Sequence, residues 1–434
     1  MKQTFKLLRV LLLFTAFSIG SSSIWAAVTD SLLIKIAALQ NVSNVQRLES
    51  SQFKDKYVLF MEQPLDKKNP SAGSFKQRIF VMNVGEERPT VIVTEGYGAA
   101  YAASSRYRDE ISRILNANII FVEHRYFLES TPKPLDWKYL TAENSANDLH
   151  NVTTAFKKLY KGKWIATGIS KGGQTALIYR AYFPDDVDVS VPYVAPLCKG
   201  REDGRHELFL RDFAGTQQER DILTNFQKDV LKRRGELQPK FDSLCNARGY
   251  KFNLPLMQIY DYSILELPFS FWQWGSPIAE VPGEGAVTAE VFKYWMKISS
   301  PDYFVNNSPT AAFFVQANRE LGYYGYDTKP FKGLLKIKSS KGYMGKLFIP
   351  RGAEFRFDKA LYKKLKKFVA TTDEKMLFIY GEFDPWSSVK VSEPKNENVV
   401  VLVEPKGSHR SRISTMPEDL KKRAVETLNR WLAD

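Results

Sequence analysis

Residues 163–182 read KWIATGISKGGQTALIYRAY, and they contain the pentapeptide G-x-S-x-G at 168–172. The stretch before the pentapeptide predicts a buried strand, and residues 174–182 predict a helix. Strand, sharp turn and helix are the context in which this pentapeptide holds a serine on a strained turn with its hydroxyl exposed. The glycines at 168 and 172 allow the tight turn and a close approach of the helix. The alternative is a βα turn with an incidental serine, and the remaining histidines and acids decide between the two.

One histidine stands where a catalytic triad needs it. Two of the four histidines follow Ser170, and of these His409 comes directly after the predicted strand 398–403. A loop after a late strand is where an α/β-hydrolase presents its histidine, and the chain order of its triad is serine, acid, histidine. We therefore predict His409 as the general base. The four histidines of the sequence are His124, His150, His206 and His409.

The acid of the triad is expected at the end of the preceding strand. Residues 375–380 predict that strand, and the segment after it, 381–386, reads GEFDPW. Asp384 is the first choice for the acid and Glu382 the second. The predicted triad is Ser170, Asp384 and His409, in which the imidazole takes the serine proton and the carboxylate fixes its tautomer.

Two backbone N–H groups are expected to stabilise the oxyanion that forms during acyl transfer. One belongs to Lys171, the residue after the nucleophile. The other is expected from residues 95–99 (EGYGA), which follow a predicted strand at 90–94, with Tyr97 or Gly98 as the donor. The alternative for this loop is a plain glycine-rich turn.

Predicted strands and helices alternate from about residue 50 to 198 and again from about residue 356 to the end. Such alternation predicts an α/β fold, here an α/β-hydrolase core with a mostly parallel sheet and helices on both faces. The intervening segment has charged helical stretches followed by aromatic ones. Because the triad residues lie on both sides of it, we predict a core of residues 27–199 and 356–434 with a mainly helical cap at 200–355 over the site.

The predicted cap contains two stretches dense in aromatic residues, 268–275 (PFSFWQWG) and 313–326 (FFVQANRELGYYGY). Aromatic faces can line an apolar pocket and stack on a flat pyrrolidine ring. We expect substrate contacts from Phe271, Trp272, Trp274 and Tyr323. The alternative is that these side chains form the core of the cap itself.

The first 26 residues are predicted to be a secretory signal peptide. Basic residues precede a short apolar run at 11–19, and small residues at 21–27 offer cleavage after Ala26 or Ala27. The run is too short to cross a membrane, and no other stretch of about 18 apolar residues occurs. We expect export to a periplasm or the extracellular space, without an integral membrane span in the mature chain. The alternative is an uncleaved anchor.

Charge and cysteine content exclude several other classes of function. The net charge of +14 falls to 14 − 3 = +11 without the three basic residues of the leader, and the densest basic run, 363–367 (KKLKK), is typical of a wet helix face. Nucleic acid is therefore not an expected partner. Cys198 and Cys245 either form a disulfide or remain free, since spacing alone does not decide. No cluster of histidines and cysteines suggests a metal site, and no cofactor is expected.

Short motifs along nearly the whole mature chain resemble one family of peptidases. The chain is similar to the secreted bacterial prolyl tri/tetrapeptidyl aminopeptidases and, more distantly, to prolyl carboxypeptidase and dipeptidyl peptidase II. No single motif is specific, but their order along the chain is. The matching segments are 63–66 (QPLD), 73–78 (GSFKQR), 95–98 (EGYG), 123–127 (EHRYF), 139–141 (YLT), 168–173 (GISKGG), 316–317 (QA), 320–322 (ELG), 384–386 (DPW) and 407–409 (GSH).

The resemblance implies a serine exopeptidase that removes short peptides from a free N-terminus by cutting after proline, with the same triad. Such an enzyme needs a carboxylate to bind the α-ammonium group of its peptide substrate. Glu320 in the aromatic cap segment is the first choice and Glu95 the second, the alternative for Glu320 being a structural ion pair. His124 precedes the nucleophile, so we expect it in a buried polar network near the oxyanion loop.

Other functions remain open at this point. The same triad would serve an esterase or other acyl hydrolase, or a dipeptidyl- or carboxypeptidase-like prolyl peptidase. A non-catalytic binding protein on a hydrolase fold is the third class, against which the intact triad and elbow argue.

Overall fold

A computed structural model describes residues 30–306, 308–392, 394 and 396–433. The predicted signal peptide therefore lies outside the described residues. Within them, no helix is long and apolar enough to cross a membrane.

A nine-stranded sheet organises the fold, in the order β1-β2-β3-β5-β4-β6-β7-β8-β9. The first three strands pair antiparallel with their neighbours, and all pairs from β5 through β9 are parallel. This is the predicted α/β-hydrolase arrangement, with an antiparallel edge that the sequence patterns did not reveal. The strands are β1 Val42–Arg47, β2 Asp55–Pro64, β3 Ser74–Asn83, β4 Thr90–Thr94, β5 Asn118–Val122, β6 Trp164–Ile169, β7 Val189–Tyr193, β8 Lys375–Gly381 and β9 Val399–Glu404.

Helices cover both faces of the sheet because its central strands are apolar on both sides, as parallel strands are. In β4, Val91 and Val93 pack toward one layer and Ile92 toward the other. The first layer contains α2 and α13, and the second contains α1, α3, α4 and α12. These helices are α1 Ser31–Ala37, α2 Glu110–Leu115, α3 Ala142–Phe156, α4 Lys171–Tyr182, α12 Ala360–Thr371 and α13 Glu418–Ala433.

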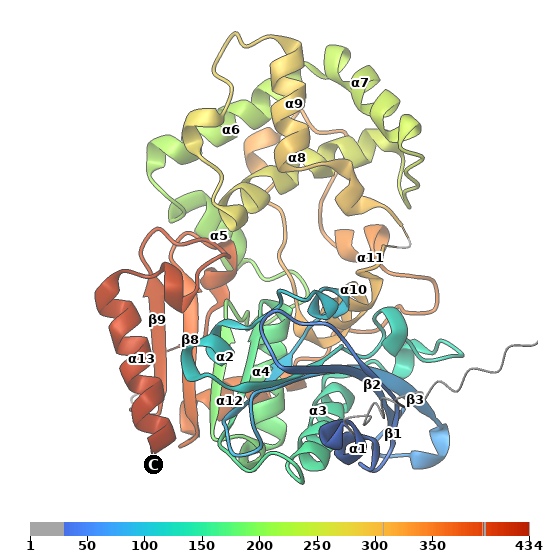
Figure 1. Cartoon of the computed structure of the whole chain (residues 1–434). Helices are drawn as coiled ribbons and strands as arrows, with labels where there is room; N and C mark the ends of the chain where they lie inside the picture. Colours follow the sequence, from blue (N-terminus) through green and yellow to red (C-terminus); the bar gives the residue numbers. More distant parts are fainter. Residues whose placement is uncertain (1–29, 307, 393, 395, 434) are drawn as a thin grey trace, which may run out of the picture.

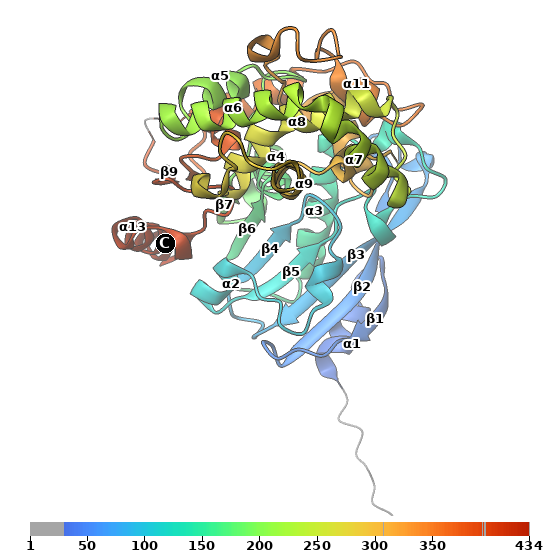
Figure 2. The same cartoon turned by 90° about the horizontal axis from the view of Figure 1, so that it is seen from above.

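A helical cap, defined here as α5 to α11, lies over one end of the sheet (Figures 1 and 2). It falls inside the segment 200–355, which we keep as the proposed bounds of the insertion. Its apolar cluster is shared with core residues, among them Tyr126 and Trp386, so the cap packs directly on the core. The cap helices are α5 Arg205–Asp212, α6 Gln217–Lys232, α7 Arg234–Ala247, α8 Leu256–Trp274, α9 Thr288–Ile298, α10 Ala311–Gln316 and α11 Tyr343–Leu347.

Candidate active site

Ser170 occupies a strained turn between β6 and α4. Its φ of 59° and ψ of −121° are unusual for a residue with a side chain, and α4 begins at the next residue. Such a conformation typically costs about 1–3 kcal/mol and persists only where the surroundings enforce it. Here the Ser170 N–H donates to the carbonyl of Tyr193 at 2.9 Å, and its carbonyl accepts from the Gln174 N–H at 2.8 Å.

Glycines make this turn possible because three backbone segments meet without room for side chains. A Cβ on Gly168 would lie 2.4 Å from the carbonyl carbon of Gly172, and one on Gly172 would lie 2.8 Å from the carbonyl oxygen of Thr94. A Cβ on Gly96 would lie 2.6 Å from the Gly172 nitrogen. The loop after β4 therefore rests directly against the serine turn, which is where an oxyanion loop has to be.

His409 and Asp384 form a buried hydrogen-bonded pair. The Nδ1–H of His409 donates to Oδ2 of Asp384 at 2.7 Å, and the two side chains are 5% and 0% exposed. The other carboxylate oxygen of Asp384 accepts from the Trp386 N–H at 3.1 Å. Because an ionised carboxylate only accepts, the imidazole proton is held on Nδ1, and Nε2 is left to receive a proton.

The cap also holds the histidine in place. The backbone N–H of His409 donates to the carbonyl of Gln273 in α8 at 2.9 Å, and the Trp274 ring meets the imidazole edge-on with centroids 6.0 Å apart. The end of α8 therefore fixes the loop that carries His409.

The remaining acid and histidine choices lie elsewhere. Glu382 is exposed and accepts from the Lys406 N–H at 2.7 Å. The Nδ1–H of His124 donates to the Arg125 carbonyl, His150 stacks on Phe183, and His206 packs against Trp386. Within the described residues, none of these three histidines makes a hydrogen bond or ion pair with Ser170.

The polar network expected around His124 is present. Glu123, at the end of β5, is fully buried and accepts from the Ala99 N–H at 2.8 Å and from the Ser130 hydroxyl at 2.9 Å. The His124 N–H donates to the Tyr97 carbonyl at 3.2 Å. These bonds tie the loop after β4 to the neighbouring strand and so fix the position of Tyr97 and Gly98.

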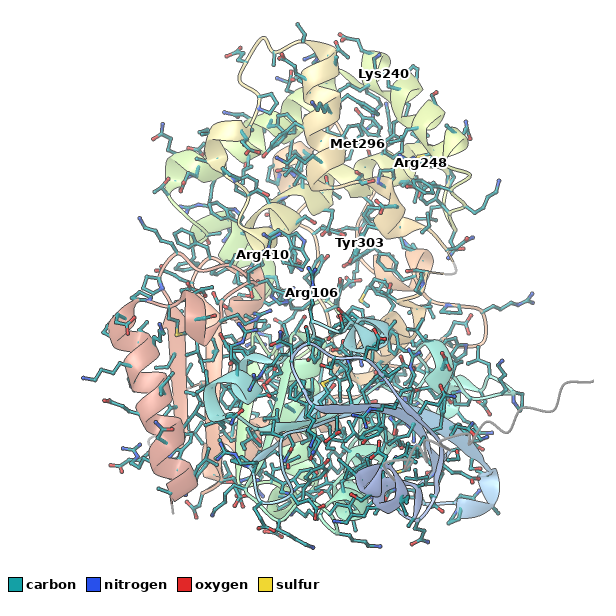
Figure 3. The ribbon with its side chains drawn as sticks, viewed as in Figure 1. Arg106, Lys240, Arg248, Met296, Tyr303 and Arg410 are labelled. Atoms are coloured by element: carbon teal, nitrogen blue, oxygen red, sulfur yellow. The ribbon has the colours of Figure 1, made fainter. Side chains whose placement is uncertain are left out.

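A cavity of about 720 Å³ lies between cap and core, with Ser170 and His409 in its wall. This volume lies within the range of about 300–1,000 Å³ that is usual for ligand sites. In Figure 3 the side chains of Tyr303 and Arg410, which both line the cavity, lie where the cap meets the core. The cavity is therefore the place where a substrate would meet the serine.

Aromatic rings run along this cavity from the serine to the histidine. Burial raises the pKa of Tyr97, and its hydrogen bond with the Ser170 side chain opposes that rise. From Tyr97 the chain of ring contacts continues to Phe313 at 5.5 Å, to Tyr323 at 5.5 Å and to Trp386 at 5.3 Å. The Trp386 ring in turn lies 6.4 Å from that of His409. The result is a flat-walled apolar surface beside both reactive groups.

Some residues expected to contact substrate line the cavity and others do not. Glu95, Trp274 and Tyr323 are in its wall. Phe271 and Trp272 are instead 1% and 6% exposed within the apolar cluster of the cap and are not among the residues that line it, so they act as core.

Glu320 also lies outside the cavity wall, contrary to the role expected of it. Its carboxylate accepts from the Ala142 N–H at 2.7 Å, at the first residue of α3. Burial raises its pKa to about 7, and the bond to Ala142 opposes that rise. A carboxylate at a helix N-terminus satisfies an N–H that has no partner within the helix, which is a structural role.

Glu95 has a cation close to it already. It accepts from the Tyr101 hydroxyl at 2.6 Å, and burial raises its pKa while Tyr101 and the charge of Lys171 oppose the rise. The Lys171 ammonium lies 5.8 Å above the Tyr97 ring and 5.5 Å above the Phe127 ring. Burial lowers the pKa of Lys171 to about 7, and Glu95 opposes that shift.

Several wall residues were missed from sequence. Trp386 directly follows the Asp384-Pro385 pair, and its position beside the acid was the available signal. Glu266 is the only charged residue in the stretch 262–272 (YSILELPFSFW). A lone acid among mostly apolar residues could have marked it as a candidate for the site. Other missed wall residues are Ser270, Tyr303, Phe314 and Tyr324.

The structure bears on two further features, the state of the two cysteines and the presence of metal-binding clusters. Cys198 and Cys245 are both buried free thiols, so the disulfide left open by the sequence is not formed here. Burial raises the pKa of both thiols, that of Cys245 to about 11. Across the described ranges, no group of three His, Cys, Asp or Glu side chains is arranged to hold a metal ion.

Comparison with known proteins identifies the family to which the chain is similar. Residues 31–433 match the PS-10 peptidase S37 family. A prolyl tri/tetrapeptidyl aminopeptidase of Streptomyces mobaraensis is 30% identical over 384 residues, which cover 86% of this chain and 79% of that protein.

Solved structures match as well, at low identity. A proline iminopeptidase of Mycobacterium smegmatis is 12% identical, with a TM-score of 0.38 over 90% of this chain and 100% of that one. An esterase of Pyrococcus furiosus is 14% identical, with a TM-score of 0.37 over 90% and 100% of the two chains. Because the family match spans nearly the whole described chain, the protein belongs to the PS-10 peptidase S37 family and is a serine peptidase.

Proposed function

We propose that this serine peptidase is an exported exopeptidase that releases tripeptides and tetrapeptides from free N-termini by cleavage after proline. The observation that carries the proposal is the hydrogen bond of 2.7 Å between His409 Nδ1 and Asp384 Oδ2, together with the cavity that His409 and Ser170 both line. The similarity to the prolyl tri/tetrapeptidyl aminopeptidase of Streptomyces mobaraensis supports the substrate class.

In the proposed mechanism Ser170 attacks the carbonyl of the proline residue. The Nε2 atom of His409 removes the hydroxyl proton and returns it to the leaving amine, and Asp384 stabilises the imidazolium in between. The resulting acyl-enzyme is hydrolysed by water, which His409 activates in the same way. We assign the oxyanion to the Lys171 N–H and to the N–H of Tyr97 or Gly98, because the loop at Gly96 touches the serine turn.

The ring surface from Tyr97 to Trp386 supports the preference for proline. A pyrrolidine ring is flat and apolar, and aromatic faces bury it without leaving polar groups unpaired. Proline also has no backbone N–H, so an apolar wall that holds it leaves no such donor without a partner.

A direct test separates this proposal from other acyl hydrolases. Wild type and Ser170→Ala are given an Xaa-Xaa-Pro chromogenic peptide, the same peptide with alanine in place of proline, and a simple ester. We expect turnover of the proline peptide far above that of the alanine peptide, and labelling of Ser170 by a phosphonate probe. Ester turnover without any peptide cleavage would make the protein an esterase, and no labelling of Ser170 would make it a binding protein.

Export rests on the predicted leader at 1–26. The mature protein recovered from the periplasm or medium should begin after Ala26 or Ala27, which mass spectrometry of the N-terminal peptide measures. Recovery of the protein in the membrane fraction with residues 1–26 still attached would mean that the leader is an uncleaved anchor.

A further inference from the structure

Glu266 is a buried carboxylate in the wall of the active-site cavity. It lies on the cap helix α8, is 4% exposed, and lines the same cavity as Ser170 and His409. Its hydrogen bonds come from Ser270, Tyr324 and Tyr326 and not from Ser170, Asp384 or His409, so the acyl-transfer chemistry does not account for a charge at this place.

Three hydroxyl groups donate hydrogen bonds to this carboxylate. The hydroxyls of Tyr324 and Tyr326 reach Oε2 at 2.8 Å and 2.7 Å, and that of Ser270 reaches Oε1 at 2.8 Å. A carboxylate has about four lone-pair sites and accepts at all of them, so one more donor can be received. This arrangement of donors suits the ionised form and leaves a place for a cation.

Glu266 differs from the other buried acids in its lack of a cationic partner. Six carboxylates are buried in the described chain, and five of them pair with an arginine or a histidine within 4 Å. Among the described residues no lysine, arginine or histidine forms such a pair with Glu266. The five pairs are Glu123 with Arg78, Asp148 with Arg125, Asp203 with Arg205, Asp261 with Arg234 and Asp384 with His409.

An unpaired buried charge is costly, and burial therefore favours the neutral form of this carboxyl group. Burial raises the pKa of Glu266 to about 7, and the bonds from Tyr326, Ser270 and Tyr324 oppose the rise. The attraction of a cation in the cavity would offset the rest of the desolvation cost, which the three hydroxyl groups offset only in part.

The surroundings of Glu266 favour an ammonium ion as that cation. The Tyr324 ring stacks on that of Tyr323 at 4.2 Å and meets Trp386 at 5.6 Å, so aromatic faces stand next to the carboxylate. Aromatic faces attract cations, and the effect is larger where water is excluded. The hydroxyl of Tyr303, on the cap side in Figure 3, extends the polar network at 3.0 Å from that of Tyr324.

We propose that Glu266 binds the α-ammonium group of the peptide substrate, with its place in the cap defining how far the N-terminus extends beyond Ser170. This inference rests on the proposed exopeptidase function and replaces Glu320 in the role that the sequence had suggested. Glu95 is the weaker choice, because Lys171 already stands beside it. Glu320 is also the weaker choice, because its carboxylate accepts from the Ala142 N–H and does not line the cavity.

The test compares a free-amine Ala-Ala-Pro chromogenic peptide with its N-acetylated twin in wild type and Glu266→Gln. Glutamine keeps the shape and accepts hydrogen bonds but loses the charge. We expect the ratio of kcat/KM between the two peptides to fall by about 10- to 100-fold, mainly through a higher KM for the free amine. Glu320→Gln is the matched control, and it should keep the wild-type ratio.

The outcomes separate this inference from the proposed function. A wild type that prefers the free amine, with an unchanged ratio in Glu266→Gln, overturns the ammonium site and leaves the exopeptidase standing. A wild type that cuts neither peptide, although it turns over an amine-free ester, overturns both.

A second variant covers a failure to fold. If Glu266→Gln has no ester turnover, Glu266→Asp is tested in its place. Aspartate keeps the charge, but its side chain is shorter by one methylene group. The free-amine KM should then rise more than the KM of the acetylated peptide. An equal rise for both peptides would mean that Glu266 only supports the cap.

Discussion

Asp384 holds the imidazole of His409 through a hydrogen bond of 2.7 Å, while the cap holds the same residue through its backbone N–H. The imidazole is thus oriented from the core and from the insertion at once. Cap and core must therefore pack correctly before Nε2 can serve as the base, which ties the catalytic geometry to the presence of the cap.

Asp384→Asn should lower kcat by about 10⁴-fold with little change in KM. An amide can donate to Nδ1 and thereby favour the wrong tautomer, which leaves no acceptor for the serine proton. Steady-state kinetics with the free-amine peptide measure the change, and circular dichroism checks that the fold is kept. Glu382→Gln, at the rejected acid, should retain activity. If Glu382→Gln and Asp384→Asn were equally impaired, the choice of acid would be wrong.

Gly172→Ala should destabilise the protein and reduce phosphonate labelling of Ser170. The new methyl group would lie 2.8 Å from the carbonyl oxygen of Thr94, and backbone atoms cannot move aside as a side-chain end can. Overpacking of this kind typically costs about 1–3 kcal/mol. Thermal unfolding measures the stability change.

The matched control for that substitution is Gly235→Ala. Gly235 lies in α7, and a Cβ there would meet nothing within 4 Å. Alanine is the better helix former, so we expect no loss of stability. Equal destabilisation by the two alanines would show that the serine turn is less tightly packed than described.

The preference for a free amine should depend on pH with a maximum near neutrality. Below its pKa of about 7, Glu266 is mostly protonated and cannot pair with an ammonium ion, so the preference falls toward pH 6. Above about pH 8 the peptide α-amino group loses its proton, and the preference falls again. The ratio of kcat/KM for free and acetylated peptides measures this, because the chemistry of the triad is common to both and cancels.

The groups facing Glu266 do not change charge in that range. The titratable groups among them are tyrosines whose pKa is raised by burial, so they stay neutral between pH 6 and 8, and the Ser270 hydroxyl does not titrate. A flat ratio over this range would contradict a titrating anchor. These tyrosines are Tyr303, Tyr323, Tyr324, Tyr326 and Tyr343.

Arg125→Met should destabilise the fold by about 3–5 kcal/mol, because it leaves Asp148 buried without its partner. The guanidinium bonds both carboxylate oxygens at 2.7 Å, and each side chain is 1% exposed. Denaturant unfolding measures the difference. Arg211→Met, which breaks the exposed pair with Asp212, serves as the control and should leave unfolding unchanged. Similar midpoints for the two variants would argue against the importance of the buried pair.

The sequence predicted the elements whose chemistry is local. The serine turn, the candidate triad residues and the parallel strands followed from short motifs and apolar runs, each of which spans no more than about ten residues. The antiparallel strands β1 and β2 were not foreseen, since their alternating pattern is weak and their partners are distant in the chain.

The residues that contact substrate were harder to predict from sequence, because the position of each in the cavity depends on how segments distant in the chain pack together. Phe271 and Trp274 are only three residues apart in one helix, yet the first packs in the cap core and the second lines the cavity. Glu266 is buried and Glu320 half-buried, both close in sequence to aromatic residues, and only the contacts each makes with other elements separate the roles we propose for them. Sequence patterns give residue type and face but not the neighbour on a different element.

The most direct test of the account is product analysis of an unlabelled peptide that begins Ala-Ala-Pro. Mass spectrometry should detect free Ala-Ala-Pro from the wild type, no product from the N-acetylated peptide, and none from either peptide with Ser170→Ala. Cleavage of both peptides at internal bonds, or release of Ala-Ala-Pro by Ser170→Ala, would contradict a serine exopeptidase that reads a free N-terminus and cuts after proline.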